Sequence, residues 1–280
     1  MHKTINRSVG GNITAFAILI LLGTFMVLPL VYVVSNAFKP LEELFIYPPR
    51  FFVRNPTVQN FRDMVTVLAQ SRVTFTRYLF NTVFITVVGT LGHLFLSSMA
   101  AFVLSRHKFP GKAVIFKLIV LSLMFTPSVT SVSSFIIISR LRLLDTFWAI
   151  LLPAFQSTLG LYLMKQFMDT LPEAIFESAR IDGAGEIRVY WQISMPMVKP
   201  AWITLMILMI QNLWNTQSPY IFSEQMKSLP QAMGQIIAGG IARTGVASAV
   251  SFLIMLVPLS VFIISQSQVI ETMSSSGIKE

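Results

Sequence analysis

The densest group of acidic side chains in this sequence lies between Leu171 and Pro196. Grouped carboxylates can act as acids and bases, bind a metal ion, or pair with basic groups of another protein. Metal or acid–base chemistry would normally add cysteine or histidine, but the chain has no cysteine, and its three histidines form no spaced ligand pair: His2, His93 and His107. We therefore expect no metal site and no nucleophile–base–acid set, but a segment that contacts a protein partner.

The residue types within this segment predict two short helices joined by a bend. Pro172 can start a helix, and Glu173 would lie near its positive amino-terminal end. Gly183 and Gly185 can end that helix with a residue at positive φ. A second helical piece then leads to Pro196. Such a pair of helices would project and fit a cleft on a partner; an ordinary amphipathic surface loop is the alternative.

The elements around this segment are apolar enough to lie in a membrane. Hydrophobic residues make up 54% of the 280 residues and charged residues 12%, against about a quarter in soluble domains. Several continuous apolar runs reach the roughly 20 residues that cross a bilayer core. They do not alternate at period two, which favours helices over a barrel. We expect an all-α protein with six spans, near residues 13–37, 79–104, 113–138, 147–167, 201–221 and 246–264.

The connecting segments give the protein a sidedness. With six spans, both termini and the acidic segment at 168–199 lie on one side, and the long segments at 39–77 and 223–244 lie on the other. Lys and Arg divide almost evenly, but the basic turn at 106–112 favours the terminal side as cytoplasmic. We interpret the net charge of +9 as membrane-flanking charge rather than a nucleic-acid-binding face. The run at 13–37 is too long for a signal-peptide core and is expected to remain as a span.

The composition of the predicted spans limits how the protein could be driven. They include no Asp or Glu, whereas ion-coupled transporters usually keep acidic residues at membrane depth. The chain also lacks the Gly-x-x-x-x-Gly-Lys-Ser/Thr phosphate loop. A transporter with this sequence would need a separate ATPase that binds the ATP and Mg, and this chain would bind no cofactor directly.

A spaced motif within the acidic segment resembles a known signature. Glu177-Ser178-Ala179, three residues, Gly183, nine residues and Ile193-x-Met195-Pro196 are similar to the EAA loop of binding-protein-dependent ABC importers. That signature is Glu-Ala-Ala, three residues, Gly, nine residues and Ile-x-Leu-Pro. The chain departs from it at Ser178 and Met195, with residues of similar size or apolarity. The flanking Leu171-Pro172-Glu173 and 180–184 resemble the carbohydrate branch of these permeases, the maltose-type family.

Further short matches follow in the same order along the chain. They are Ser35-Asn36-Ala37-Phe38-Lys39-Pro40, Tyr78-Leu79-Phe80-Asn81-Thr82, Trp214-Asn215 and Gly277-Ile278-Lys279. The resemblance implies the six-helix MetI-like permease fold, with a cytoplasmic amino-terminal segment, a first transmembrane helix, an extracytoplasmic segment, a permease core and a cytoplasmic tail at residues 1–12, 13–37, 38–77, 78–266 and 267–280.

The same resemblance implies a function. The chain would be a multi-pass permease subunit, not an enzyme, of an ATP-driven sugar or oligosaccharide importer in a bacterial inner membrane. Its partners would be the lipid bilayer, a second homologous permease, two ATPase subunits and an extracytoplasmic sugar-binding protein, with no nucleic acid. A polyol or sugar phosphate as cargo, or a membrane scaffold or sensor that transports nothing, are the alternatives.

In that family the acidic segment is the coupling helix, which inserts into a groove on the ATPase. Carried over to this chain, Glu177 would pair with a basic group of the ATPase, and Ser178 and Ala179 would allow close packing. Gly183 would form the bend. Arg180 and Asp182 would make polar contacts at the rim, and Ala184 completes the set of expected coupling residues.

Polar faces at helical spacing are the candidates for contact with cargo. In the fifth span Gln211 and Asn215 share a face, and amides suit sugar hydroxyls because they both donate and accept. Trp214 could stack on a sugar ring. The third span offers Thr126 and Thr130, and the second Thr86, Thr90, His93 and Ser97. Packing between helices is the alternative role for such residues.

Overall fold

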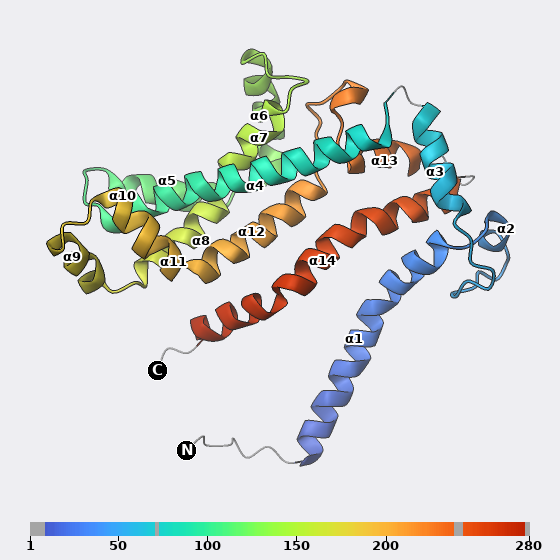
Figure 1. Ribbon diagram of the computed structural model, residues 1–280, viewed down its shortest axis with the longest axis horizontal. Helices are drawn as coiled ribbons and strands as arrows, with labels where there is room; N and C mark the ends of the chain where they lie inside the picture. The colour runs from blue at the N-terminus through green and yellow to red at the C-terminus, as the bar shows by residue number, and fades with distance from the viewer. Residues whose placement is uncertain (1–8, 71–72, 238–242, 278–280) are drawn as a thin grey trace. The chain divides into compact units, whose positions relative to one another are not determined.

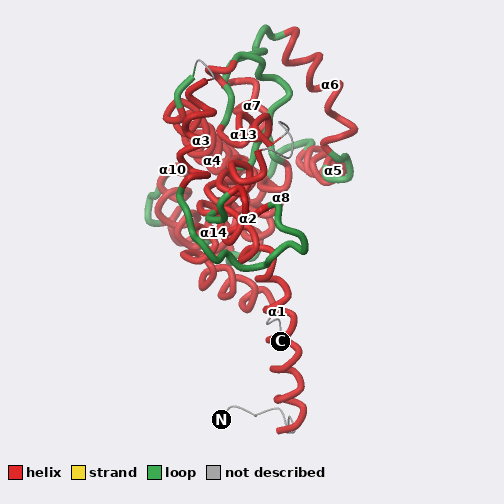
Figure 2. The backbone as a smooth tube through the Cα atoms, turned by 90° about the vertical axis from the view of Figure 1, so that its right-hand side faces the viewer, coloured by secondary structure: helices red, strands yellow, loops and turns green. Residues whose placement is uncertain are grey.

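The computed structural model describes residues 9–70, 73–237 and 243–277. Figure 2 shows only helices and loops in this part of the chain, so the all-α prediction is confirmed. Parts of the predicted terminal segments, residues 1–8 and 278–280, lie outside the described residues, and with them Ile278 and Lys279 of the carboxy-terminal match. The chain divides into two compact units, residues 1–70 with 233–255, and residues 71–232 with 256–280.

The first unit contains α1 (Val9–Ala37), α2 (Leu41–Leu44), α3 (Gln59–Gln70) and the beginning of α14 (Thr244–Gly277). Three phenylalanine rings join these elements: the ring of Phe38 lies 5.2 Å from that of Phe61 and 5.9 Å from that of Phe252. The Asn60 amide donates to the carbonyl oxygens of Ala37 and Lys39, at 2.9 and 2.7 Å. A short, tightly bonded segment therefore follows the exposed, apolar α1.

The second unit is built on α4 (Phe75–Arg106), against which α7 (Trp148–Phe155), α8 (Thr158–Asp169) and α12 (Lys199–Trp214) pack (Figure 1). Glycines on α4 allow this close approach. A Cβ at Gly89 would lie 2.5 Å from Leu213 of α12, and one at Gly92 would lie 2.3 Å from the ring of Phe155. The remaining helices of this unit are α5 (Lys112–Ser122), α6 (Pro127–Arg140), the short helices of the acidic segment, a 3-10 turn at Glu224–Met226, the start of α13 (Leu229–Ile237) and the later part of α14.

Three single helices of the described chain are long and apolar enough to cross a membrane: Gly11–Ala37, Phe75–Arg106 and Thr244–Gln266. The pair Glu186–Met197 and Lys199–Trp214, bent by 78°, would count as a fourth span. These helices correspond to the first, second, sixth and fifth predicted spans. Helix α12 ends at Trp214, before the predicted boundary at residue 221.

The third and fourth predicted spans are each divided into two helices. The break after α5 ends at Thr126, which has an extended backbone (φ −74°, ψ 149°), because a residue that precedes proline avoids the helical region. Helices α7 and α8 are separated by Gln156 and Ser157, and Ser157 again leaves the helical region (φ −54°, ψ 112°). Apolarity predicted where these runs lie, but not that each bends.

At one end of α4, side-chain hydrogen bonds attach the loop that precedes α13. The Asn81 amide donates to the carbonyl oxygens of Gln225 and Lys227, at 2.8 and 2.9 Å. The Thr82 hydroxyl accepts from the backbone N–H of Leu229 at 2.7 Å. The predicted extracytoplasmic loop is therefore tied to the helix at the centre of the unit.

Asp145, between α6 and α7, attaches the same loop from another side. Its carboxylate accepts from the N–H of Phe222 at 3.0 Å and from the N–H and hydroxyl of Ser223 at 2.9 and 3.0 Å. Partial burial acts to raise the pKa of Asp145, but these three hydrogen bonds favour the charged form and together bring the pKa below its ordinary value of 3.8.

Candidate functional site

The acidic segment forms the two short helices that its residues predict. Helix α9 (Glu173–Ile181) begins directly after Pro172, and α10 (Glu186–Val189) follows after a bend. Gly183 has φ +78°, as expected for the end of α9, where a Cβ would be strained. Gly185 differs from the expectation: its φ is −70°, and it caps the start of α10 instead.

The chain then continues into α12 through a sharp bend. A π-helical turn (Tyr190–Ser194) and α11 (Met195–Met197) follow α10 without a break, and α12 begins at Lys199. Prolines at Pro196 and Pro200 lie in the first turns of α11 and α12, where no backbone N–H is needed. The two acidic-segment helices are therefore connected directly to a long apolar helix.

Each of the two helices has a buried face and an exposed face. Phe176 is fully buried and Ala179 nearly so, and both pack with Val189 and the end of α8. On the outside, Ile181 and Ile187 are 86% and 79% exposed. The segment therefore presents apolar surface on the side opposite its core-facing residues.

The predicted coupling residues lie mainly on the exposed side. Glu177 and Asp182 are exposed, and Asp182 is the residue that ends α9. Ser178 is exposed as well, and its hydroxyl donates to the carbonyl oxygen of Ala174. Ala184 is half-buried, and its N–H donates to the Ala179 carbonyl at 2.9 Å, which closes the bend.

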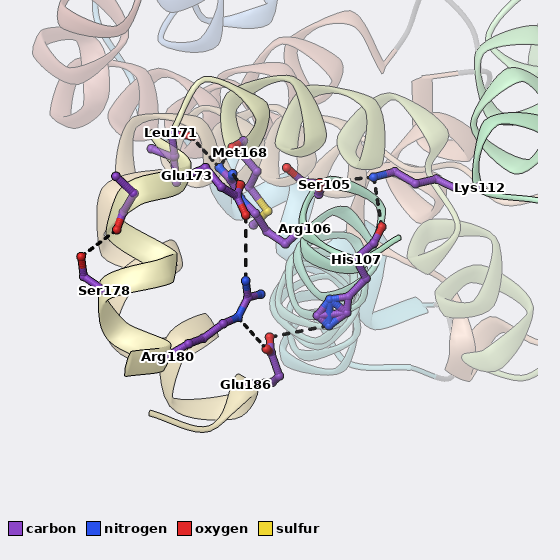
Figure 3. Close-up of polar contacts among 11 residues, drawn as sticks. Ser105, Arg106, His107, Lys112, Met168, Leu171, Glu173, Ser178, Arg180 and Glu186 are labelled. Atoms are coloured by element: carbon purple, nitrogen blue, oxygen red, sulfur yellow. Dashed lines mark hydrogen bonds and ion pairs between the residues drawn. The ribbon is translucent and has the colours of Figure 1, made fainter. Parts of the chain in front are cut away.

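A buried arginine at the end of α4 holds the acidic segment from the inside (Figure 3). The Arg106 side chain is 5% exposed, and its guanidinium pairs with the Glu173 carboxylate at 2.7 Å. It also donates to the carbonyl oxygens of Met168 and Leu171, at the end of α8, and lies 4.0 Å from the ring centre of Phe176. One side chain thus contacts α8, α9 and the link between them.

The side chains of Arg180, Glu186 and His107 extend these contacts to α10. Arg180 lies 3.9 Å from Glu173 and 3.1 Å from Glu186, and Glu186 lies 3.6 Å from the Nε2 of His107 (Figure 3). Because Arg106 and His107 are consecutive, the chain of contacts closes on itself. Alternating charges therefore connect both short helices to the end of α4.

Sequence reasoning did not assign a role to most of these contacts. Arg106 and His107 stood out only as part of a basic turn and Glu186 only as part of an acidic group, and Glu173 was expected at the start of a helix but not in an ion pair with α4. Phe176 carried no signal beyond its apolarity. Their pairing depends on α4 and α9 being brought together across more than sixty residues of sequence, which no local pattern predicts.

The residues predicted to contact cargo occupy different environments. Gln211 is half-buried and Asn215 exposed, and the Asn215 amide donates to the Gln211 carbonyl at 3.0 Å. Thr126 and Thr130 are exposed at the start of α6. Trp214 is only 5% exposed and lies within the packed core of its unit. The amides and threonines are therefore the accessible members of this set.

The polar face of α4 is buried within the second unit. Thr86, Thr90 and His93 are all at most 5% exposed. The Nδ1 of His93 lies 3.2 Å from the carbonyl oxygen of Phe155, where α7 ends. These residues take part in helix packing, which is the alternative that their spacing left open.

Comparisons with known proteins agree with this geometry. A family model described as "Binding-protein-dependent transport system inner membrane component" matches residues 93–272. Protein LplC of Bacillus subtilis (strain 168) is 31% identical over 222 residues, 77% of this chain and 71% of LplC. The polygalacturonan/rhamnogalacturonan transport system permease protein YtcP of the same organism is 29% identical over 201 residues, 72% of this chain and 68% of YtcP.

The fold matches a solved transporter over nearly its whole length. A chain in the crystal structure of a bacterial ABC transporter that imports the acidic polysaccharide alginate aligns with a TM-score of 0.80 at 21% identity. The alignment covers 94% of this chain and 99% of that one. The chain described here belongs to the family of binding-protein-dependent transport system inner membrane components, and it is a transport subunit rather than an enzyme.

Proposed function

We propose that this chain is one of two permease subunits of an ATP-driven importer for sugars or oligosaccharides. It would cross the inner membrane several times and receive cargo from an extracytoplasmic binding protein. Two ATPase subunits, which bind the ATP and Mg, would supply the energy, because this chain has no phosphate-binding loop of its own.

The observation that carries the proposal is the two-sided form of the α9–α10 segment. Its inner face, around Phe176 and Ala179, is anchored in the core of the second unit. Its outer face presents the Glu177 carboxylate together with the highly exposed Ile181 and Ile187. A firmly anchored projection with an apolar and acidic outer face suits insertion into a groove with a basic lining, and it suits poorly a scaffold that has no such partner.

Movement of this projection would be passed to the helices that surround the cargo. The segment continues through the 78° bend into α12 and is attached to α4 through Arg106. Closure of the ATPases would displace the α9–α10 segments of both permeases and open the cavity between them outward. ATP hydrolysis would return the cavity inward, as in other transporters that alternate around a site near the midplane.

A sugar as cargo is supported by the relatives and by the residues available. YtcP carries polygalacturonan and rhamnogalacturonan transport in its name, and the structural match imports alginate. Gln211, Asn215, Thr126 and Thr130 offer neutral donors and acceptors. A phosphate group would call for a cation facing the cavity, but the predicted spans include only Lys117 and Lys165, both near span ends. Lys165 already pairs with Asp169 and lies over the ring of Phe116.

Six spans remain our proposal for the topology. Each of the two divided runs, at residues 112–140 and 148–169, would cross the membrane as one bent span, with its breaks buried against neighbouring helices or facing the cavity. The α9–α10 segment then lies on the cytoplasmic side, where the ATPases are.

The experiment replaces Glu177 with lysine in the complex purified through this chain and reconstituted with its binding protein in liposomes. We expect binding-protein-stimulated ATP hydrolysis and uptake to fall together, by about tenfold or more, because a basic groove would meet a cation of like charge. Glu177→Gln should give a smaller loss. Glu42→Lys is the matched control, since Glu42 is exposed on the first unit and the charge change is the same. Unchanged hydrolysis and uptake in Glu177→Lys would contradict the proposal.

A further inference from the structure

The end of α4 is joined to α9 by a single polar side chain. Within the described residues, every hydrogen bond and ion pair between α4 and α9 comes from Arg106. Ser105 also reaches out from this end of α4, but it donates to Asp169 of α8. The polar connection between α4 and α9 therefore depends on Arg106, beside the apolar core that Ala101 and Phe102 of α4 share with Phe176 and Ala179 of α9.

The site around Arg106 is built for a guanidinium. The nitrogen Nη1 pairs with Glu173, while Nη2 donates to two carbonyl oxygens, those of Met168 and Leu171. The flat face of the group lies over Phe176. Planar, divergent donors are needed to reach all of these partners at once, and a lysine ammonium offers only a compact point charge.

Burial explains why the attachment is firm. The Arg106 side chain is 5% exposed, whereas its partner Glu173 is 53% exposed. Taking a guanidinium out of water is costly unless its hydrogen bonds are retained. Separating Arg106 from Glu173 and from the two carbonyl oxygens is therefore unfavourable. By contrast, the outer contacts of Arg180, which is 36% exposed, are screened by solvent and weak.

The outer contacts contribute little stability, but they extend the attachment from α9 to α10. Arg180 and Glu186 continue the alternating charges from Glu173 to α10, and Glu186 returns to His107 beside Arg106 (Figure 3). Glu173 of α9 pairs with Arg106, and Glu186 of α10 lies beside His107, the residue that follows α4, so the polar contacts of both short helices converge at the end of α4.

We propose that Arg106 is a positioning residue that makes the α9–α10 segment move as one body with α4, so that movement of the segment drives α4 instead of being absorbed at the bend. This inference rests on the proposed function for the source of the movement. It assigns to Arg106 a role in coupling and no contact with cargo or nucleotide.

The first arm of the test measures position and needs no transport. The chain has no cysteine, so Ile181→Cys on α9 and Leu91→Cys on the exposed side of α4 can carry spin labels in the purified complex, with partner cysteines replaced. Double electron–electron resonance should give one narrow distance distribution with Arg106 present. Arg106→Gln should lose that narrow peak, and Arg106→Lys should restore it only in part. An equally narrow peak in Arg106→Gln would overturn the proposal.

The second arm uses the assembled complex and measures the number of sugar molecules imported for each ATP hydrolysed. In Arg106→Gln we expect this ratio to fall about tenfold, since more than one charge-assisted hydrogen bond is lost. Glu173→Gln should give a smaller fall, because it removes only one of the contacts, and it replaces Arg106→Gln as the deciding variant if that protein fails to assemble. Lys108→Gln is the control: Lys108 is exposed and has no hydrogen bond or ion pair in the part of the chain that is described.

The outcomes separate the two proposals. A merely structural role would lower the amount of complex and leave the ratio per complex unchanged, and an unchanged ratio would overturn the coupling role of Arg106 even if the distances broaden. If the unaltered complex imports no sugar with ATP and binding protein, the proposed function fails. The distance measurement then still decides whether Arg106 positions the segment.

Discussion

Gly160 of α8 lies against a buried imidazole, and adding a single methyl group there should destabilise the second unit strongly. A Cβ at Gly160 would lie 2.0 Å from the Nε2 of His93 and 2.6 Å from its Cε1. His93 is 1% exposed, so the ring has little room to move away. Movement would also break its contact with the Phe155 carbonyl at 3.2 Å, where α7 has ended and that oxygen has no helical partner.

The size of the effect follows from these contacts. Overpacking in a well-packed core costs about 1–3 kcal/mol, and losing the buried hydrogen bond adds about 1 kcal/mol. We therefore expect Gly160→Ala to destabilise the protein by about 3 kcal/mol. For a chain of this size that corresponds to a fall in Tm of roughly 5–10 °C.

The assay is thermal unfolding of the purified complex in detergent, followed by a label on this chain. Gly23→Ala is the matched control, because Gly23 is also helical and a Cβ there would meet nothing within 4 Å. The double variant His93→Ala/Gly160→Ala removes the clash, so its Tm should lie above the value expected from adding the two single effects. A Gly160→Ala protein as stable as the control, or purely additive effects, would show that the His93 ring does not oppose a methyl group at this position.

Three further predictions use other contacts. Gly183→Ala should strain the bend, at about 1 kcal/mol for a left-handed residue, and reduce coupled uptake, whereas Gly185→Ala at φ −70° should not; uptake assays on both compare them directly. The pKa of Asp145 lies below 3.8, so the charged carboxylate stabilises the protein above pH 3.8, and this stabilisation is lost as the pH falls through the folded-state pKa. Melting scans from pH 6 to 2 should show a steeper loss of Tm than in Asp145→Asn, and parallel curves would contradict this prediction. Replacing Gln211 and Asn215 together by Ala should raise the KM for sugar uptake by about tenfold if each amide binds a hydroxyl, and an unchanged KM and rate would remove both from the cargo pathway.

The parts of the fold that the sequence predicts well are those with one dominant physical cause. Helix α4 follows from a long apolar run without proline. Helix α1 follows from a long apolar run that includes Pro29, which does not end the helix. The bend after α9 follows from Gly183, because only glycine takes φ +78° without strain. Local chemistry was sufficient at these places.

The features that the sequence prediction missed are one break with a local cause and others that depend on contacts made in three dimensions. Pro127 signals a break in the third apolar run, but hydropathy alone reads that run as continuous. The break at Ser157 has no comparably clear local cause. It follows the contact between His93 of α4 and the carbonyl oxygen of Phe155, the last residue of α7. Arg106 illustrates the same limit at the site, since a basic residue at a helix end is usually read as flanking charge.

We propose that the α9–α10 segment lies in the cytoplasm and docks on an ATPase. Its most direct test places a cysteine or photo-crosslinker at Ile181, which is 86% exposed at the tip of α9 in a chain that has no cysteine of its own. We expect a covalent product between Ile181 and an ATPase subunit, and no reaction with a membrane-impermeant thiol reagent added to intact cells. Reaction from outside the cell, or a crosslink to no nucleotide-hydrolysing protein, would contradict it.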